Sequence, residues 1–198
     1  MRHPVMEERL DVHASLVLAL LTGVGLAAAS GLRAFLPLLV VGLASRAGWL
    51  DLRPGSEWLA SDLALWALGT AAVLEIVGDK FPVVDHALDA LGTVVRPAAA
   101  WVATFAVLSH WPAPWPALFA SIFGAGALAL QIAKAKARLT STALTLGHGN
   151  PVLSFAEDAG ATTLLALAIA APIVGALVAI AGVVVVVMLL RRKRPATA

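Results

Sequence analysis

The chain has 198 residues, of which 60% are hydrophobic and 13% are charged, and its mean hydropathy is +0.90. Soluble domains contain roughly 45–50% apolar and about 25% charged residues, so the composition excludes a water-soluble protein. The net charge of +2 is too small to indicate a nucleic-acid partner, and the absence of cysteine excludes disulfides, thiolate metal sites and cysteine nucleophiles. The length predicts one membrane-embedded domain over residues 1–198.

The first apolar segment, residues 12–30, ends in small residues as a signal peptide does. A secretory leader begins with a basic region, whereas here three acidic residues offset the two arginines that precede residue 12. A further apolar segment follows at once. We therefore expect residues 12–30 to be a retained first helix.

A membrane-spanning helix needs about 20 mostly apolar residues. The candidate segments are 12–30, 34–48, 59–77, 97–110, 115–133 and a tract from 159 to 190. That tract is too long for one upright helix, because at about 1.5 Å per residue it exceeds a hydrocarbon core of roughly 30 Å. Pro172 is expected to kink or divide it. We expect an all-α polytopic protein with six to seven membrane helices and short broken or re-entrant segments.

Tryptophan and basic residues predict the two sides of the membrane. Residues 49–58 and 111–115 each begin and end with Trp, which is enriched at the headgroup level; an aromatic substrate cage is the alternative. Basic residues dominate the tail 191–198, which places the C-terminus in the cytoplasm. Both Trp loops and the N-terminus then lie outside. The Ala-, Leu- and Val-rich, lysine-poor composition indicates a bacterial inner membrane.

Two pairs of segments resemble each other. Residues 32–44 resemble residues 137–149, each with an arginine nine positions before a glycine, and residues 82–92 resemble residues 172–182. Either the chain has repeat halves over about 12–110 and 115–190, or low-complexity sequence produces the likeness by chance. Repeated halves with broken helices are typical of transporters.

The strongest local feature is the charged stretch EIVGDKFPVVDHALD, residues 75–89, in an otherwise apolar chain. It contains four of the 12 acidic residues, together with Lys80 and His86, and Arg96 follows. The four acids are Glu75, Asp79, Asp85 and Asp89. Hydrocarbon tolerates such groups only when they pair, face water or lie at the headgroup level.

Two interpretations of this stretch remain open. Glu75 ends a long apolar run and is expected within the membrane, four residues from Asp79 on one helical face. Pro82 is expected to begin a short amphipathic or re-entrant element that carries Asp85 and Asp89. The four carboxylates suit a proton or a hard divalent cation. Alternatively, Asp85, His86 and Asp89 form the wet face of a surface helix.

A second polar cluster spans residues 134–163. Lys134 and Arg138 share a helical face, and the glycines around His148 break the helix. Ser154 and Glu157 fit a capping box, with Asn150 as an alternative cap and Asp158 in the first turns. Alternatively, this broken helix faces residues 75–96, and Arg33 or Arg138 pairs with their acids. Residues 139–149 are too short and too polar to span a membrane.

The motifs E-x-x-G-D-K-x-P-x-x-D (75–85), V-R-P (95–97), K-A-x-x-R (134–138) and N-P-x-x-S-x-x-E-D (150–158) occur in this order. The chain thereby resembles the bacterial membrane family called domain of unknown function 4126, from about Gly31 to Pro172. That resemblance implies the fold and the choice of residues, and no activity. A looser likeness is to cation–proton exchangers with a Glu-x-Gly-Asp-Lys/Arg motif, although Glu75 is one residue too far from Gly78.

We expect a small carrier or channel for an ion or small solute, coupled to a proton or cation through buried carboxylates. The alternative is a lipid-binding, lipid-translocating or assembly protein whose basic residues bind anionic lipid. The bilayer is the expected partner, and a homo-oligomer is compatible with the pattern. No cofactor or complete catalytic set is expected. The candidate binding residues are Arg33, Glu75, Asp79, Lys80, Asp85, Asp89, Arg96, Arg138, Asn150, Ser154, Glu157 and Asp158.

Overall fold

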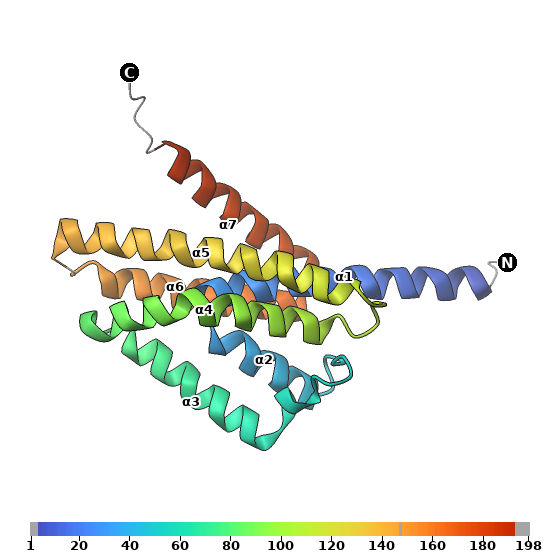
Figure 1. Cartoon of the computed structure of the whole chain (residues 1–198). Coiled ribbons are helices and arrows are strands. Elements are labelled where there is room, and N and C mark those ends of the chain that lie inside the picture. The colour runs from blue at the N-terminus through green and yellow to red at the C-terminus, as the bar shows by residue number, and fades with distance from the viewer. Residues whose placement is uncertain (1–3, 147, 193–198) are drawn as a thin grey trace.

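The computed structural model describes residues 4–146 and 148–192, and within them the side chains of residues 12–81, 84, 87–146, 148–185 and 187–188. These residues form an all-α fold of seven α-helices and one short 3-10 helix (Figure 1). In chain order they are α1 (Pro4–Leu32), α2 (Phe35–Arg46), η1 (Glu57–Ala60), α3 (Asp62–Gly78), α4 (Pro82–Val107), α5 (Trp115–Thr145), α6 (Asn150–Ala170) and α7 (Pro172–Arg192). The predicted all-α class is confirmed.

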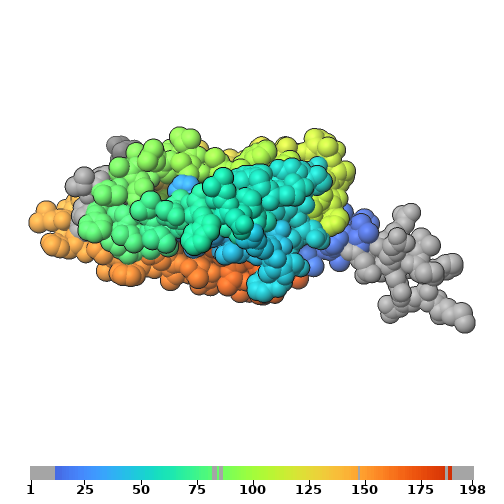
Figure 2. Space-filling model, turned by 90° about the horizontal axis from the view of Figure 1, so that it is seen from below, coloured from blue at the N-terminus to red at the C-terminus, as the bar shows by residue number. Residues whose placement is uncertain are grey.

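Helix α1 lies at the centre and contacts α4, α5, α6 and α7 (Figure 1). Helices α2 and α3, with η1 between them, form a second group along one side, where α3 packs mainly on α2. Figure 2 views the molecule from this side, and the segment from α2 to α3 covers much of the face. Several large apolar side chains of α3 point outwards; Trp66, for example, is 78% exposed.

The helices connect at two opposite ends of the bundle (Figure 1). At the tryptophan end, defined by connections 47–61 and 108–114, Arg53 joins the two loops. Its backbone N–H donates to the Ala106 carbonyl (2.8 Å), and its guanidinium donates to the carbonyls of Leu108 (3.1 Å) and Trp111 (2.8 Å). The turn 79–81 and the end of α5 lie at the opposite end of the bundle. We call it the network end, after the ion pairs that meet there. The two Trp-flanked loops therefore share one end.

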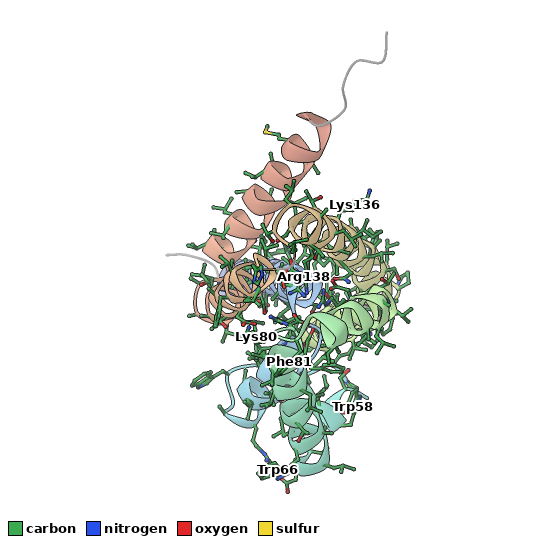
Figure 3. The ribbon with its side chains drawn as sticks, turned by 90° about the vertical axis from the view of Figure 1, so that its left-hand side faces the viewer. Trp58, Trp66, Lys80, Phe81, Lys136 and Arg138 are labelled. Atoms are coloured by element: carbon green, nitrogen blue, oxygen red, sulfur yellow. The ribbon has the colours of Figure 1, made fainter. Side chains whose placement is uncertain are left out.

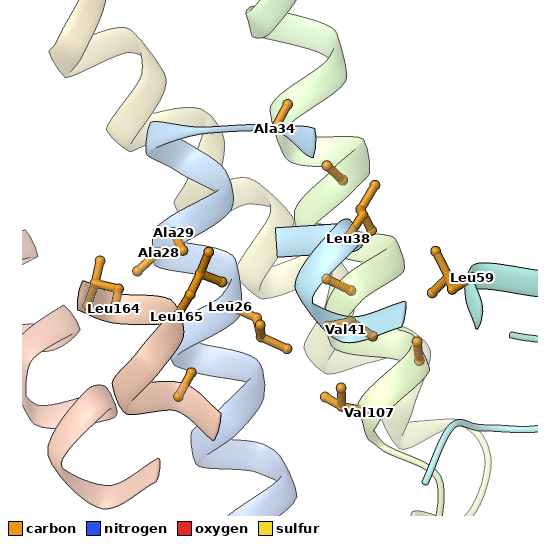
Figure 4. Packing of buried hydrophobic residues seen from close by; sticks show 14 of the residues in the cluster. Leu26, Ala28, Ala29, Ala34, Leu38, Val41, Leu59, Val107, Leu164 and Leu165 are labelled. Atoms are coloured by element: carbon orange, nitrogen blue, oxygen red, sulfur yellow. The ribbon is translucent and has the colours of Figure 1, made fainter. Parts of the chain in front are cut away.

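Small residues let the central helices approach closely. A side chain at Gly25 would place its Cβ only 2.8 Å from the Ala168 Cβ of α6, which is the close packing that small residues permit between membrane helices. The buried cluster around this contact includes Leu26 of α1, Val41 of α2 and Leu165 of α6 (Figure 4). This apolar core lies beside the network end and holds the helices that carry its charged side chains.

Within the described part of the chain, four helical segments are long and apolar enough to cross a membrane: 12–32, 87–107, 115–145 and 150–170. Two shorter apolar helices cover 35–46 and 172–185. Four such segments indicate a multi-pass membrane protein. Pro172 begins α7 directly after α6 ends at Ala170, so the predicted division of the 159–190 tract is confirmed.

The predicted short element after Pro82 is wrong, because residues 82–107 form one helix that continues through Pro97. Proline removes one backbone hydrogen bond, but packing against neighbouring helices makes an internal proline tolerable in a membrane helix. Gly124 of α5 allows this packing, since a Cβ there would lie 3.0 Å from the Pro97 carbonyl oxygen. The part of the acidic stretch from Pro82 to Asp89 is therefore continuous with a membrane-length helix.

The boundaries predicted for the next two helices are also corrected. Helix α5 extends to Thr145 rather than ending near residue 133, and most of the polar segment 139–149 belongs to it. Helix α6 begins at Asn150 rather than at residue 159. In α6, Ser154, Glu157 and Asp158 face charged side chains from other parts of the chain.

Gly42 gives a test of the packing between α2 and η1. A Cβ at Gly42 would lie within 3 Å of Leu65 Cδ2 (2.9 Å) and would overlap the backbone carbonyl oxygen of Leu59. We expect Gly42→Ala to lower the free energy of unfolding by about 1–3 kcal/mol, as overpacking does. Gly69→Ala is the matched control, because its Cβ would meet only Leu39 Cδ1 at 4.0 Å. Equal unfolding midpoints for both variants in a denaturing-detergent titration would contradict this packing.

Candidate functional site

Among the described side chains, ten charged groups meet at the network end, and we call this cluster the ion-pair network. They come from the end of α1, from α3 and the turn after it, and from α4, α5 and α6. The five acids are Glu75, Asp79, Asp89, Glu157 and Asp158, and the five bases are Arg33, Lys80, Arg96, Lys134 and Arg138. These ten charges balance. The sequence predicted all of them as site residues except Lys134.

Asp79 lies at the centre of the network and is 2% exposed. Its Oδ2 atom contacts Arg33 Nη1, accepts a hydrogen bond from Arg138 Nη2 (3.0 Å) and lies 3.7 Å from Lys134 Nζ. Arg33 is fully buried, and its contact with Asp79 matches the predicted alternative in which Arg33 pairs with the acids of residues 75–96. One carboxylate thus joins α1, α5 and the turn after α3.

Glu75 holds the start of α2. Its two carboxylate oxygens accept hydrogen bonds from the backbone N–H groups of Ala34 (3.0 Å) and Phe35 (3.3 Å), and Oε1 lies 3.3 Å from Arg96 Nη2. The first N–H groups of a helix have no partner within it, and a negative charge there is favourable. Glu75 of α3 therefore caps α2 from another helix, which explains why an acid sits inside an apolar run.

Arg96 is held from a second side by Gln131 of α5, whose side-chain oxygen accepts from Nη1. The Gln131 amide in turn donates to the Asp89 carbonyl (2.9 Å). Asp89 itself is only partly exposed and faces three basic side chains. The interpretation of Asp89 as a residue of a freely solvated face is therefore wrong. The side chains of Asp85 and His86 lie outside the described part of the structure.

The first turns of α6 supply the remaining acids. Glu157 accepts from Arg138 Nε (3.2 Å) and Nη2 (2.6 Å) and lies 3.0 Å from Lys134 Nζ. Asp158 pairs with Arg33 (2.5 Å) and Lys80 (2.7 Å). These contacts match the predicted alternative in which the broken helix faces residues 75–96 and pairs with Arg33 and Arg138.

The capping-box interpretation of Ser154 is wrong. Ser154 lies inside α6, fully buried, and its hydroxyl oxygen accepts from Lys80 Nζ (2.7 Å) and Arg33 Nη2 (3.1 Å). The residue before the helix is Gly149, which has no capping side chain, and the Asn150 amide donates to Thr142 Oγ1 (2.9 Å). The motif matched a cap by spacing alone, but the helix starts four residues before Ser154, so that its hydroxyl faces neighbouring helices.

Asp79 lies in the turn between α3 and α4, outside the four candidate spans. Burial alone raises the pKa of its carboxyl, but the positive charges of Lys134, Arg33 and Arg138 outweigh burial and hold the pKa below its ordinary value of 3.8. This environment disfavours the predicted binding of a proton at Asp79, because bases are interleaved with the acids. Asp79 is therefore ionised at physiological pH.

Among the described side chains, no group of three or more acidic or histidine residues is positioned to hold a metal ion. Each of Glu75, Asp79 and Asp89 faces basic groups instead. The predicted four-carboxylate site also includes Asp85, whose side chain is not described. The described carboxylates therefore form ion pairs rather than a shared set of ligands.

Two site residues were missed or understated by the sequence. Gln131 was not singled out, and Lys134 was noted only for sharing a face with Arg138. The signal was present, because residues 131, 134 and 138 lie on one helical face, and all three are buried. Figure 3 illustrates this face of α5: Arg138 points in among the helices, whereas Lys136 points away from them.

The fold and the network together define an all-α, multi-pass membrane protein with buried charges that join its helices. The chain belongs to the family described as "Domain of unknown function (DUF4126)", whose model matches residues 20–192. No curated protein and no solved structure matches the chain. The family match includes every residue of the ion-pair network.

Proposed function

We propose that this protein is a small membrane carrier or channel for an ion or small solute, and that the ion-pair network is its working site. The supporting observation is the burial of six ionisable side chains at the network end: Arg33, Glu75, Asp79, Arg96, Lys134 and Arg138. Removing charges from water costs several kcal/mol per ion, and apolar side chains would join the helices at lower cost. Ionisable residues inside a membrane protein are typical of substrate and ion pathways.

In this proposal, a coupling proton or cation acts through the carboxylate of Glu75. It binds the start of α2 and also faces Arg96 of α4. Neutralising Glu75 weakens both contacts. Helix α2 packs against η1 and α3, so the three elements are expected to move together. In this proposal, coupling through Glu75 moves the α2–α3 group relative to the central helices, while Asp89, Glu157 and Asp158 line the approach from water.

The test is flux through purified protein in liposomes that contain a pH-sensitive dye, after external additions of sodium, potassium, magnesium or phosphate. We expect a dye response that empty liposomes lack and that Glu75→Gln abolishes. Asp62→Asn is the matched control, since Asp62 pairs with Arg46 on the exposed surface and should transport like the wild type. Full flux with folded Glu75→Gln protein would refute this role of Glu75, and no response to any ion would count against the carrier.

A lipid-handling or assembly protein is the second candidate. It is favoured by the balance of five acids and five bases, which suits structural ion pairs. The burial of Arg33, Arg96 and Arg138 speaks against headgroup binding at an open interface. The exposed apolar side chains of α3 are compatible with lipid or with a second copy of the chain. A lipid-dependent assembly state without any flux would support this candidate.

The proposed arrangement has six to seven membrane helices in a bacterial inner membrane. The network end and the C-terminal tail 191–198 face the cytoplasm, and the tryptophan end and N-terminus face outwards. The internal two-fold repeat also remains a proposal, supported by the contact of both Arg33 and Arg138 with Asp79. Unequal helix numbers, four before residue 110 and three after it, require an additional helix in the first half.

Sidedness can be tested cleanly because the chain has no native cysteine. We expect a membrane-impermeant maleimide added to intact spheroplasts to label Asp51→Cys, at the tryptophan end, but not His148→Cys, at the network end. Both positions are exposed. Both variants should react after permeabilisation, which controls for reactivity. The opposite pattern of labelling would invert the proposed orientation.

A further inference from the structure

Four of the five basic side chains of the network lie deeper than most of its acids, and the fifth, Lys80, is 24% exposed. Arg33, Arg96, Lys134 and Arg138 are all buried, whereas Glu75 and Asp79 are the acids buried to the same degree among the described residues. The side chains of Asp89, Glu157 and Asp158 retain 15%, 11% and 22% exposure. The buried layer thus has four positive and two negative charges, and the three rim carboxylates together with Lys80 supply the balance.

One of these rim carboxylates is held loosely. The Asp89 carboxylate lies 3.6 Å from Lys134 Nζ, 3.9 Å from Arg96 Nη1 and 4.0 Å from Arg138 Nη1. Hydrogen bonds between charged nitrogen and oxygen atoms are about 2.7–2.9 Å long. By comparison, the Glu157 carboxylate lies 2.6 Å from Arg138. Three basic side chains therefore surround the Asp89 carboxylate, but none of them lies within the usual hydrogen-bond distance of it.

The same region contains buried donors that the described residues do not satisfy. Arg96 Nε is buried and donates no hydrogen bond within the described part of the chain. Lys134 Nζ is also buried and makes no hydrogen bond of regular geometry there, although Glu157 Oε2 lies 3.0 Å from it. Buried donors normally find a partner, because leaving one unpaired costs about 1–3 kcal/mol. Glycine at position 92 leaves room for these donors, since a Cβ there would lie 3.1 Å from Gln131 Nε2 and 3.3 Å from Arg96 Nε. A ligand with several oxygen acceptors suits these donors better than the single carboxylate of Asp89.

We propose that Arg96, Lys134 and Arg138 form a binding subsite for a small oxyanion, a carboxylate or phosphate group, in which the Asp89 carboxylate acts as an internal stand-in. An entering monoanion replaces the charge of Asp89 one for one, and the partly exposed Asp89 turns towards water. The network stays neutral throughout. The inference rests on the proposed carrier function in naming the class of substrate, but the subsite can be tested by binding alone.

The test is titration calorimetry of the full chain in phosphatidylcholine nanodiscs, with inorganic phosphate or acetate at constant ionic strength set by chloride. Asp89→Asn removes the internal competitor. We expect it to bind phosphate at least about tenfold more tightly than the wild type, because a charge about 4 Å from three cations is removed from competition. Asp62→Asn should bind phosphate as the wild type does. Equal phosphate affinity in Asp89→Asn and wild-type protein would overturn the proposal.

A second variant separates the subsite from a general charge effect. Asp89→Asn combined with Lys134→Gln restores the charge balance and removes one of the three cations, so we expect saturable phosphate binding to disappear. Retained binding would overturn the subsite. If Asp89→Asn alone does not fold in chloride buffer, phosphate in the purification buffer should restore it, and failure to do so also counts against the proposal.

The oxyanion can come from free solute or from a lipid headgroup, and the nanodiscs distinguish them. Phosphate binding in phosphatidylcholine identifies a free anion. Retention of phosphatidylglycerol in native mass spectra, lost in Lys134→Gln, identifies a headgroup; neither result would overturn the subsite. Anion binding without flux would refute the carrier and leave the subsite, whereas flux without anion binding would refute the subsite and leave the carrier.

Discussion

Asp79→Asn should lower the free energy of unfolding by about 3–5 kcal/mol, which is the usual cost of removing one partner from a buried ion pair. The substitution keeps the size of the side chain but removes its charge. Arg33 and Arg138 then lose the carboxylate that both contact, and Lys134 loses a charge 3.7 Å away. All three bases are buried, so water cannot replace the missing charge.

The measurement is unfolding of the purified protein in mixed micelles by titration with a denaturing detergent. Asp62→Asn is the matched control, because it also removes an acid from an ion pair, but the side chains of Asp62 and Arg46 are 79% and 50% exposed. Exposed pairs contribute about 0–1 kcal/mol. Similar losses in the two variants would mean that Asp79 lies in water rather than at the centre of a buried network.

The sequence predicted the all-α class because hydrophobic composition and segment length are local properties. It failed at α4 and α5 for a physical reason. Pro82 was expected to begin a short element that carries Asp85 and Asp89, and the next span was expected only at 97–110, yet residues 82–107 are one helix. A charge or proline ends a helix only when its environment cannot accommodate it. Other helices supply that environment. Gln131 donates to the Asp89 carbonyl, Lys134 faces the Asp89 carboxylate, and Gly124 packs against Pro97.

The candidate site was predicted in more detail than the fold, because charged residues in an apolar chain are few and must meet one another. The sequence left two alternatives for the start of α6, and one of them was ion pairing with Arg33 or Arg138. The structure contains both ion pairs, Arg33 with Asp158 and Arg138 with Glu157. The capping of α2 by Glu75 could not be predicted from the sequence. It joins residues 41 positions apart through backbone N–H groups, which carry no sequence signal. The role of Ser154 was mistaken because its spacing to Glu157 also fits a local motif.

Combining Asp79→Asn with Arg33→Gln should recover part of the stability that Asp79→Asn loses. Arg33 is the fully buried base in direct contact with Asp79. Removing both charges returns the network to balance, and Asp158, the other acid partner of Arg33, keeps Lys80 at 2.7 Å. We expect a coupling free energy of about 1–3 kcal/mol in a double-mutant cycle, as for residues in one buried network.

The matched comparison is Asp79→Asn combined with Arg46→Gln. That pair also removes one acid and one base and leaves the net charge of the chain equal to that of the first double variant, but Arg46 lies outside the network in an exposed pair with Asp62. Its effect should add to that of Asp79→Asn within about 0.5 kcal/mol. Equal recovery with Arg46→Gln would mean that overall charge, rather than pairing inside the network, controls stability. Recovery with Arg33→Gln alone would establish that the buried charges stabilise the bundle as paired units, so that a substrate or proton entering there must exchange partners with them.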